Sequence, residues 1–182
     1  MLDPMRNSLV AHGDSDVQPL GGTFGRDEVS MIPDTIERTV VIDATPERVW
    51  AVLTEPAFLG GWFGNGDPVK VELRPGGVLI FDHGVHGTIP ARVETVEPPN
   101  VFSWRWSQGA AGEEPTPSNA TLVEFTLTVD RATGGTRLTM VESGFARLGL
   151  SDDEVADRHR ANGRNWPGKL DQLRERFERA QA

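Results

Sequence analysis

The sequence predicts a single domain of the α+β class. A β-branched strand is followed directly by two short helices, and the middle of the chain alternates apolar and polar residues between Gly- and Pro-rich turns. The last part carries an apolar stripe at helical spacing. Together these observations predict one strand, two helices, an antiparallel sheet and a long C-terminal helix, in that order.

The first strand and the helix pair follow from residues 35 to 63. The segment from Thr35 to Asp43 is rich in β-branched residues and roughly alternating, which is typical of a strand. Thr45 can cap a helix that begins at Pro46, because the first helical position needs no N–H. Pro56 ends or redirects this helix, and a second short apolar helix runs to Phe63.

The middle of the chain predicts an antiparallel sheet. Each expected strand is bounded by residues that favour turns, such as Arg74-Pro75-Gly76-Gly77. Pro90 suggests an edge strand or a bulge, and Gln108 to Asn119 should form a long exposed loop. Strands are expected at residues 69–73, 78–83, 88–97, 101–107, 121–130 and 136–142.

The inner face of this sheet should be aromatic and apolar, because alternate residues of a strand share one face. The strand at residues 101–107 supplies three aromatic side chains, and the hairpin between residues 121 and 142 supplies the others. The residues expected to point inward are Phe102, Trp104, Trp106, Val123, Phe125, Leu127, Val129, Leu138, Met140 and Glu142.

The C-terminal helix is expected to begin at Ser151, which forms a capping box with Glu154. Pro167 cannot donate to the carbonyl four residues earlier, so the helix should kink or restart between Gly163 and Pro167. Such a kink would leave a cavity beside the sheet. The buried stripe is expected to contain Val155, His159, Asn162, Trp166, Leu170, Leu173 and Phe177.

Composition narrows the class of protein. With 182 residues, of which 37% are hydrophobic, the chain can bury a sizeable core. It has no cysteine, which excludes disulfides and thiolate metal sites and favours a reducing cytoplasm. Its net charge of -9 argues against a broad basic surface for nucleic acid. No run approaches a membrane span of ~20 apolar residues and no secretory signal is evident, so we expect a cytoplasmic protein.

Residues 1–33 differ from the rest of the chain. They are rich in glycine and acidic residues and lack a sustained apolar period. We expect a flexible N-terminal tail over residues 1–33 and a folded domain over residues 34–180.

Several separated motifs resemble one known superfamily. They are ERTVVIDATPERVWAVLTEPAFLGGWFG, LRPGGVLIF, GTIPARVETVEPPNVFSWRW, GGTRLTMVESGF and NWPGKL. In this order they resemble the START-like (SRPBCC) superfamily, in the branch similar to the C-terminal domain of 90-kDa heat-shock-protein ATPase activators. The resemblance implies a helix-grip fold, in which a curved antiparallel sheet of about six or seven strands wraps the C-terminal helix and leaves an apolar cavity.

Most chemistries lack support in the sequence. His83 and His86 lie three apart next to Asp82, but a metal site needs three or more convergent ligands, so no metal is expected. There is no nucleophile elbow and no cysteine nucleophile, and we assign no catalytic residue. The Gly-Gly pairs do not open helices after strands, so no nucleotide or other cofactor is expected.

The candidate ligand site lies between the sheet and the C-terminal helix, around Trp104, Trp106 and Trp166. Glu142 is the most informative polar residue, because a buried carboxylate needs a partner such as His159, Arg105, a water or a ligand group. Most of the aromatic burial is explained by packing alone. The candidate ligand-binding residues are Trp62, Phe81, His83, Trp104, Trp106, Phe125, Met140, Glu142, Phe145, His159, Trp166 and Leu170.

Three functions follow from these observations. We favour non-covalent binding of a small apolar or aromatic molecule, with apolar area supplying affinity and Glu142, His83 and His159 supplying orientation. The first alternative is a chaperone-associated interaction protein, as the resemblance implies. The second is a cyclase-like or hydrolytic enzyme that uses Glu142 and a histidine as acid and base.

Overall fold

A computed structural model describes residues 33–64 and 70–179 of the protein. The predicted tail, apart from Pro33, and Val69 lie outside the described residues. The strands are β1 (Thr35–Ile42), β2 (Lys70–Val71), β3 (Val78–Asp82), β4 (Thr88–Glu97), β5 (Val101–Ser107), β6 (Ala120–Val129) and β7 (Thr136–Ser143). The helices are α1 (Pro46–Thr54), α2 (Pro56–Phe63) and α3 (Asp152–Arg179), with short 3₁₀ turns η1 (Gly84–His86) and η2 (Phe145–Arg147).

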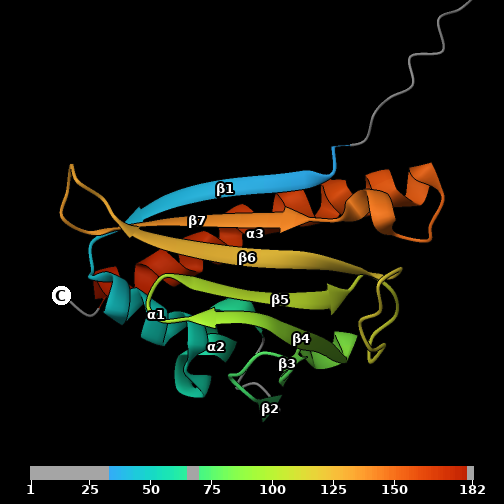
Figure 1. The fold of residues 1–182 in the computed structure, drawn as a ribbon, viewed down its shortest axis with the longest axis horizontal. Coiled ribbons are helices and arrows are strands. Elements are labelled where there is room, and N and C mark those ends of the chain that lie inside the picture. Colours follow the sequence, from blue (N-terminus) through green and yellow to red (C-terminus); the bar gives the residue numbers. More distant parts are fainter. Residues whose placement is uncertain (1–32, 65–69, 180–182) are drawn as a thin grey trace, which may run out of the picture. The chain divides into compact units, whose positions relative to one another are not determined.

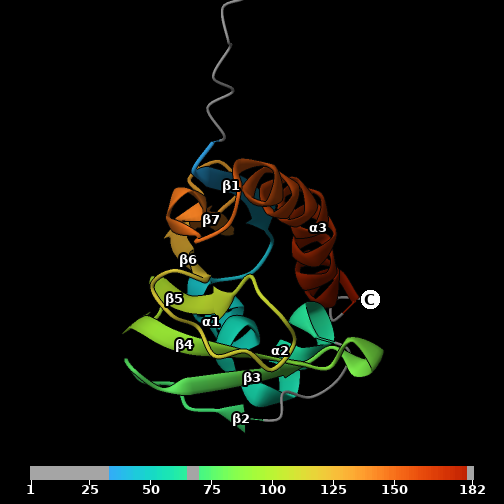
Figure 2. The same ribbon diagram turned by 90° about the vertical axis from the view of Figure 1, so that its right-hand side faces the viewer.

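These strands form one antiparallel sheet in the order β1-β7-β6-β5-β4-β3-β2. Figures 1 and 2 show that the sheet curves and that α3, α1 and α2 lie on its concave side. The α+β class, the seven-stranded curved sheet, the two short helices after the first strand and the long C-terminal helix are therefore confirmed. No helix in the described part of the chain is long and apolar enough to cross a membrane.

The helix pair begins and ends where the prolines predict. Thr45 occupies the N-cap position of α1, but its side chain makes no capping hydrogen bond. Its carbonyl instead accepts hydrogen bonds from the backbone N–H groups of Arg48 (3.0 Å) and Val49 (3.1 Å). Only Glu55 separates α1 from α2. The chain therefore turns sharply at this point and directs the end of α2 toward the sheet.

Three details of the sheet differ from the sequence-based expectation. Strand β2 pairs with β3 only through Lys70 and Val71, so Leu73 lies beyond the ladder and is 39% exposed. Val129 is the last residue of β6 and is 59% exposed rather than inward-facing. Strand β4 is an inner strand, and its bulge falls between Val93 and Thr95. Pro90 is tolerated because the ladder with β5 begins only at the next residue.

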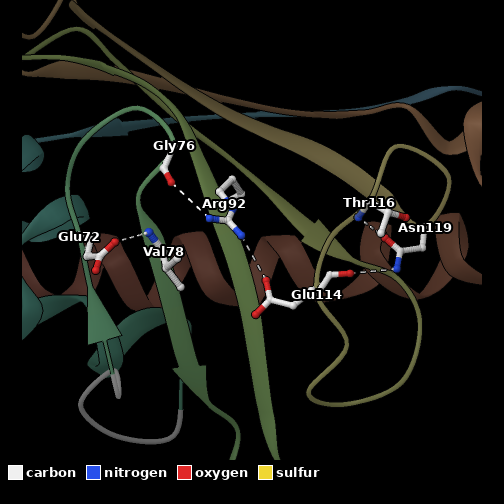
Figure 3. A network of polar contacts seen from close by, with 7 residues as sticks. All are labelled: Glu72, Gly76, Val78, Arg92, Glu114, Thr116 and Asn119. Carbon is white, nitrogen blue, oxygen red and sulfur yellow. Dashed lines mark hydrogen bonds and ion pairs between the residues drawn. The ribbon is translucent and has the colours of Figure 1, made fainter.

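The loop from Gln108 to Asn119 is held to the sheet by polar contacts (Figure 3). Arg92 on β4 donates to the Gly76 carbonyl at 3.3 Å and to the Glu114 carboxylate at 3.5 Å. Within the loop, the Asn119 amide donates to the Glu114 carbonyl at 3.1 Å. These contacts connect the loop to β4 and to the turn before β3.

Helix α3 continues without a break through Pro167, so of the predicted kink or restart between Gly163 and Pro167 the restart is wrong. Proline cannot donate to the carbonyl of Gly163, but Arg38 on β1 donates to it instead, through Nη2 at 3.2 Å. The carbonyl therefore keeps a hydrogen-bond partner, and the same contact ties α3 to the edge strand. The predicted capping box is confirmed, because the Ser151 N–H donates to the Glu154 carboxylate at 2.9 Å and the Glu154 N–H donates to Ser151 Oγ at 3.4 Å.

The contact between Arg38 and Gly163 can be tested with a double-mutant cycle. We expect Arg38→Met to lower the free energy of unfolding by about 1–2 kcal/mol, since it removes a charge-assisted hydrogen bond from a helical carbonyl. In a Pro167→Ala background the alanine N–H can replace the arginine, so the same change should cost much less. Urea unfolding of the four proteins measures the coupling. Equal costs of Arg38→Met in both backgrounds would contradict the assignment.

Candidate functional site

Glu142 is the polar centre of the molecule's interior. It lies on β7 in the same alternation as Leu138 and Met140, and all three side chains are fully buried, as the sequence predicts. Since a carboxylate can only accept hydrogen bonds, its burial requires a surrounding set of donors.

Five side-chain donors meet this carboxylate. Oε1 accepts from the Thr121 hydroxyl at 2.6 Å, the Asn162 amide at 2.9 Å, the Trp106 indole at 3.0 Å and, more weakly, the Gln108 amide at 3.5 Å. Oε2 accepts from the Trp166 indole at 2.7 Å. Each of these five donors is neutral. They come from β5, β6, α3 and the loop after β5, so one carboxylate joins all four segments.

The two amides of this set, on Asn162 and Gln108, also form hydrogen bonds within it. The Asn162 amide donates to Gln108 Oε1 at 3.0 Å, and the Gln108 amide donates to Thr121 Oγ1 at 2.9 Å. The Asn162 amide therefore has two partners and the Gln108 amide has three, which fix their orientations. We call Glu142 and its five donors the carboxylate hub.

The partners suggested from the sequence for Glu142 lie elsewhere. His159 Nε2 is 3.0 Å from the Thr35 carbonyl oxygen, and its ring packs edge-on against Phe145. Arg105 Nε donates to Glu94 at 3.0 Å. The structure does not bring Glu142 and a histidine together as an acid–base pair, and no part of Glu142 is exposed.

A cavity of about 510 Å³ lies directly beside the carboxylate hub. Four of the five donors, namely Trp106, Gln108, Asn162 and Trp166, line it, while Glu142 and Thr121 do not. The other lining residues come from α2, the turn after β3, β4, the end of β5, the loop after it and α3. They are Phe63, His83, Ile89, Ser107, Gly109, Arg158, Ala161, Asn165, Gly168, Lys169 and Gln172.

The cavity lies beside Trp106 and Trp166, as the sequence places it, but it does not reach Trp104, because Phe63 at the end of α2 fills that space. Its ring centroid lies 5.2 Å from that of Trp104, 5.4 Å from that of Trp106 and 5.8 Å from that of Trp166. Trp104 is completely buried by this packing. The open volume therefore begins only at Trp106, toward the end of the sheet where β3, β4 and the loop after β5 lie.

The structure separates the predicted site residues into three groups. His83, Trp106 and Trp166 line the cavity, and Glu142 lies behind them. His159 lies at the Thr35 carbonyl, away from the cavity lining. The remaining predicted residues are buried in the core without lining this cavity: Trp62, Phe81, Trp104, Phe125, Met140, Phe145 and Leu170.

Several residues of the site were not among the predicted ones, and they include Phe63, Gln108, Asn162 and Lys169. Helical spacing from Trp166 could have identified two of them, since Asn162 and Lys169 lie four residues before and three residues after it. Gln108 carries no such signal, because it begins an irregular loop.

Two titratable side chains face the cavity beside Phe63. Lys169 Nζ donates to the Phe63 carbonyl at 2.8 Å and lies 5.0 Å from the centroid of the Phe63 ring. Burial lowers the pKa of Lys169 below its ordinary 10.5. Burial also lowers the pKa of His83 below 6.5, and the charge of Lys169 lowers it further, so that the imidazole is neutral at pH 7. His83 Nε2 is buried and has no hydrogen-bond partner in the described part of the chain.

A second hollow of about 550 Å³ lies among the three helices, lined by residues that include Arg48, Phe58, Arg176 and Phe177. It has no buried polar cluster comparable to the carboxylate hub, so the cavity at Trp106 is the stronger candidate. The described residues contain no group of three or more His, Asp or Glu side chains placed to hold a metal ion.

The fold and the site together define a helix-grip domain with a cavity at the end of its sheet. A family model described as "Activator of Hsp90 ATPase homolog 1-like protein" matches residues 43–178, and the chain belongs to this family. This places it in the START-like (SRPBCC) superfamily, as its motifs suggested. A search of curated proteins finds no match.

Solved structures of other proteins share the fold. Protein MLL2253 from Mesorhizobium loti is 22% identical over 80% of this chain and 97% of its own, with a TM-score of 0.64. The Aha1 dimer from Colwellia psychrerythraea is 22% identical over 79% of this chain and 96% of its own, with a TM-score of 0.62. CalU16 from Micromonospora echinospora is 24% identical over 76% of this chain and 73% of its own, with a TM-score of 0.54. At these identities the likeness shows the fold alone.

The carboxylate hub should be sensitive to a change that barely alters shape. In Glu142→Gln the new amide nitrogen must face either Trp166 or the donors on Oε1, so one donor meets another donor. We expect the free energy of unfolding to fall by ~1–3 kcal/mol. Glu94→Gln on the exposed face of β4 is the control and should be nearly neutral. Urea unfolding compares them, and equal stability of Glu142→Gln and wild type would contradict the hub.

The lowered pKa of His83 gives the stability a pH dependence of known sign. As the pH falls below 6.5, the unfolded chain binds the proton before the folded protein does. The contribution of the neutral ring to the free energy of unfolding is therefore complete above pH 6.5. It decreases as the pH falls through the lowered pKa. We expect wild type to lose more stability than His83→Gln between about pH 7.5 and about pH 5. Identical pH profiles of these two proteins would contradict the burial of His83. His86→Asn serves as the control at an exposed histidine.

Proposed function

We propose that this protein binds a small aromatic or apolar molecule non-covalently in the cavity beside Trp106 and Trp166. The observation that carries the proposal is the carboxylate hub, which holds two indoles and two amides in fixed orientations around that cavity. Such an arrangement presents flat apolar surfaces together with a few directed polar groups, which is the usual composition of a ligand site.

The size and the lining of the cavity support this function. Its volume of about 510 Å³ falls within the range of ~300–1,000 Å³ that small-molecule sites occupy. Trp106 and Ile89 are half-buried and supply apolar surface, whereas Phe63 and Trp166 are almost fully buried and lie behind it. Each 100 Å² of apolar surface removed from water contributes about 2.5 kcal/mol before binding costs. Glu142 acts here by positioning its donors, since it does not reach the cavity.

Gly168 allows the cavity to be closed without disturbing the hub. It lines the cavity, and a Cβ added to it meets no atom within 4 Å. We expect Gly168→Phe to weaken binding of the uncharged dye N-phenyl-1-naphthylamine by about tenfold or more, because the new ring occupies the volume of the dye. Dye fluorescence measures the affinity, and the thermal midpoint verifies folding.

Arg164→Phe is the matched control, since it adds the same ring to an exposed position of α3 that does not line the cavity. This protein should bind the dye as wild type does. Equal affinity of Gly168→Phe and wild type, or no saturable binding of the dye to wild type, would overturn the proposal.

The family match favours a second candidate, in which the protein contacts an Hsp90-type chaperone. That function would use the outer surface of the sheet and would not require the cavity. The two candidates differ in one measurement, the ATPase rate of the chaperone from the same organism with added wild type or Gly168→Phe. Stimulation by both proteins would support the chaperone function, and no stimulation by either leaves ligand binding as the sole candidate.

A further inference from the structure

The charge of the cavity lining is opposite to that of the chain. The protein contains 27 acidic and 18 basic residues. The cavity, however, is lined by Lys169 and Arg158, by the neutral His83, and by no aspartate or glutamate. The buried carboxylate of Glu142 is already bonded to five donors and does not line the open volume. A cavity that is lined by cationic side chains and by no acidic ones favours a ligand with an anionic group.

Lys169 is the cation best placed to bind such a group. It is partly buried, and its only hydrogen bond within the described residues goes to the Phe63 carbonyl. Because an ammonium has three N–H donors, two remain for a ligand. It forms no ion pair with any carboxylate in the described part of the chain, and burial disfavours its charge. An anion entering the cavity would supply the missing counter-charge.

His83 adds a second polar group on the same side. Its Nε2 is buried without a partner among the described residues, and its ring stands edge-on to Phe63 at 6.2 Å between centroids. A neutral imidazole carries one N–H, which can donate to an anionic oxygen beside Lys169. Since His83 lines the cavity, its ring is one of the few polar groups that a ligand there can meet.

We propose that the ligand is an aromatic anion, whose carboxylate, sulfonate or ionised phenol group binds Lys169 and His83 while its rings lie against Trp106 and Trp166. This inference rests on the proposed function and adds the charge of the ligand. Arg158 lies at the exposed rim and attracts the anion, although Arg158 also interacts with Glu154 on the same helix.

A matched pair of dyes tests the charge requirement. N-phenyl-1-naphthylamine and 8-anilinonaphthalene-1-sulfonate share one ring skeleton and differ by the sulfonate. We expect the ratio of sulfonate-dye affinity to neutral-dye affinity to fall by about tenfold or more in Lys169→Met, the effect of losing a charge-assisted hydrogen bond. Lys169→Arg keeps the charge and should retain a higher ratio than Lys169→Met. Arg176→Met removes a cation from the second hollow and should leave the ratio unchanged.

Two further measurements keep the test decisive. Gly168→Phe should weaken both dyes, which places them in the same cavity. Added salt should weaken the sulfonate dye more than the neutral dye in wild type, a result that does not depend on the folding of any variant.

The outcomes distinguish this inference from the proposed function. If both dyes bind the cavity and the ratio is the same in wild type and Lys169→Met, the charge inference is overturned and ligand binding stands. If neither dye binds wild type, the proposed function is overturned together with the inference. The charge inference would also be overturned if the affinity ratio fell as strongly in Arg176→Met as in Lys169→Met, since the sulfonate dye would then respond to net charge alone.

Discussion

The structure depends on one constraint, which is that the fully buried carboxylate of Glu142 must be surrounded by donors. An uncompensated buried charge costs several kcal/mol, whereas a hydrogen bond to a charged group contributes about 1.5–3 kcal/mol. The five donors come from separate segments, so satisfying Glu142 brings β5, β6, β7, α3 and the start of the loop after β5 to one point. The same contacts fix the side chains that line the cavity.

Aromatic packing determines where that cavity lies. The sharp turn between α1 and α2 places Phe63 against Trp104, Trp106 and Trp166, so the centre of the domain is solid. Between the sheet and α3, the candidate cavity lies past Phe63, beside Lys169 and His83. The site therefore combines rigid aromatic surface on one side with titratable groups on the other, and its rigidity follows from the core rather than from the loops.

The sequence predicts the fold well and the site only in part, for physical reasons. Strand periodicity and proline positions identify β4, β5 and the two short helices, because these signals are local. The inward direction of Glu142 also follows from alternation. The hydrogen-bond partners of Glu142 cannot be predicted in this way, since Thr121, Asn162 and Trp166 come close to it only in the folded chain. The helix does not restart at Pro167, which the sequence left open, and Arg38, 129 residues earlier in the sequence, supplies the donor that proline lacks.

The most direct test of the account uses the indole N–H signals of the five tryptophans in a two-dimensional ¹⁵N NMR spectrum. Trp106 and Trp166 both bond to Glu142 and line the cavity, whereas Trp50 on α1 does not line it. During a titration with N-phenyl-1-naphthylamine, the signals of Trp106 and Trp166 should move and saturate together while that of Trp50 stays in place. Saturable binding of the dye with no movement of these two signals would contradict ligand binding at this site.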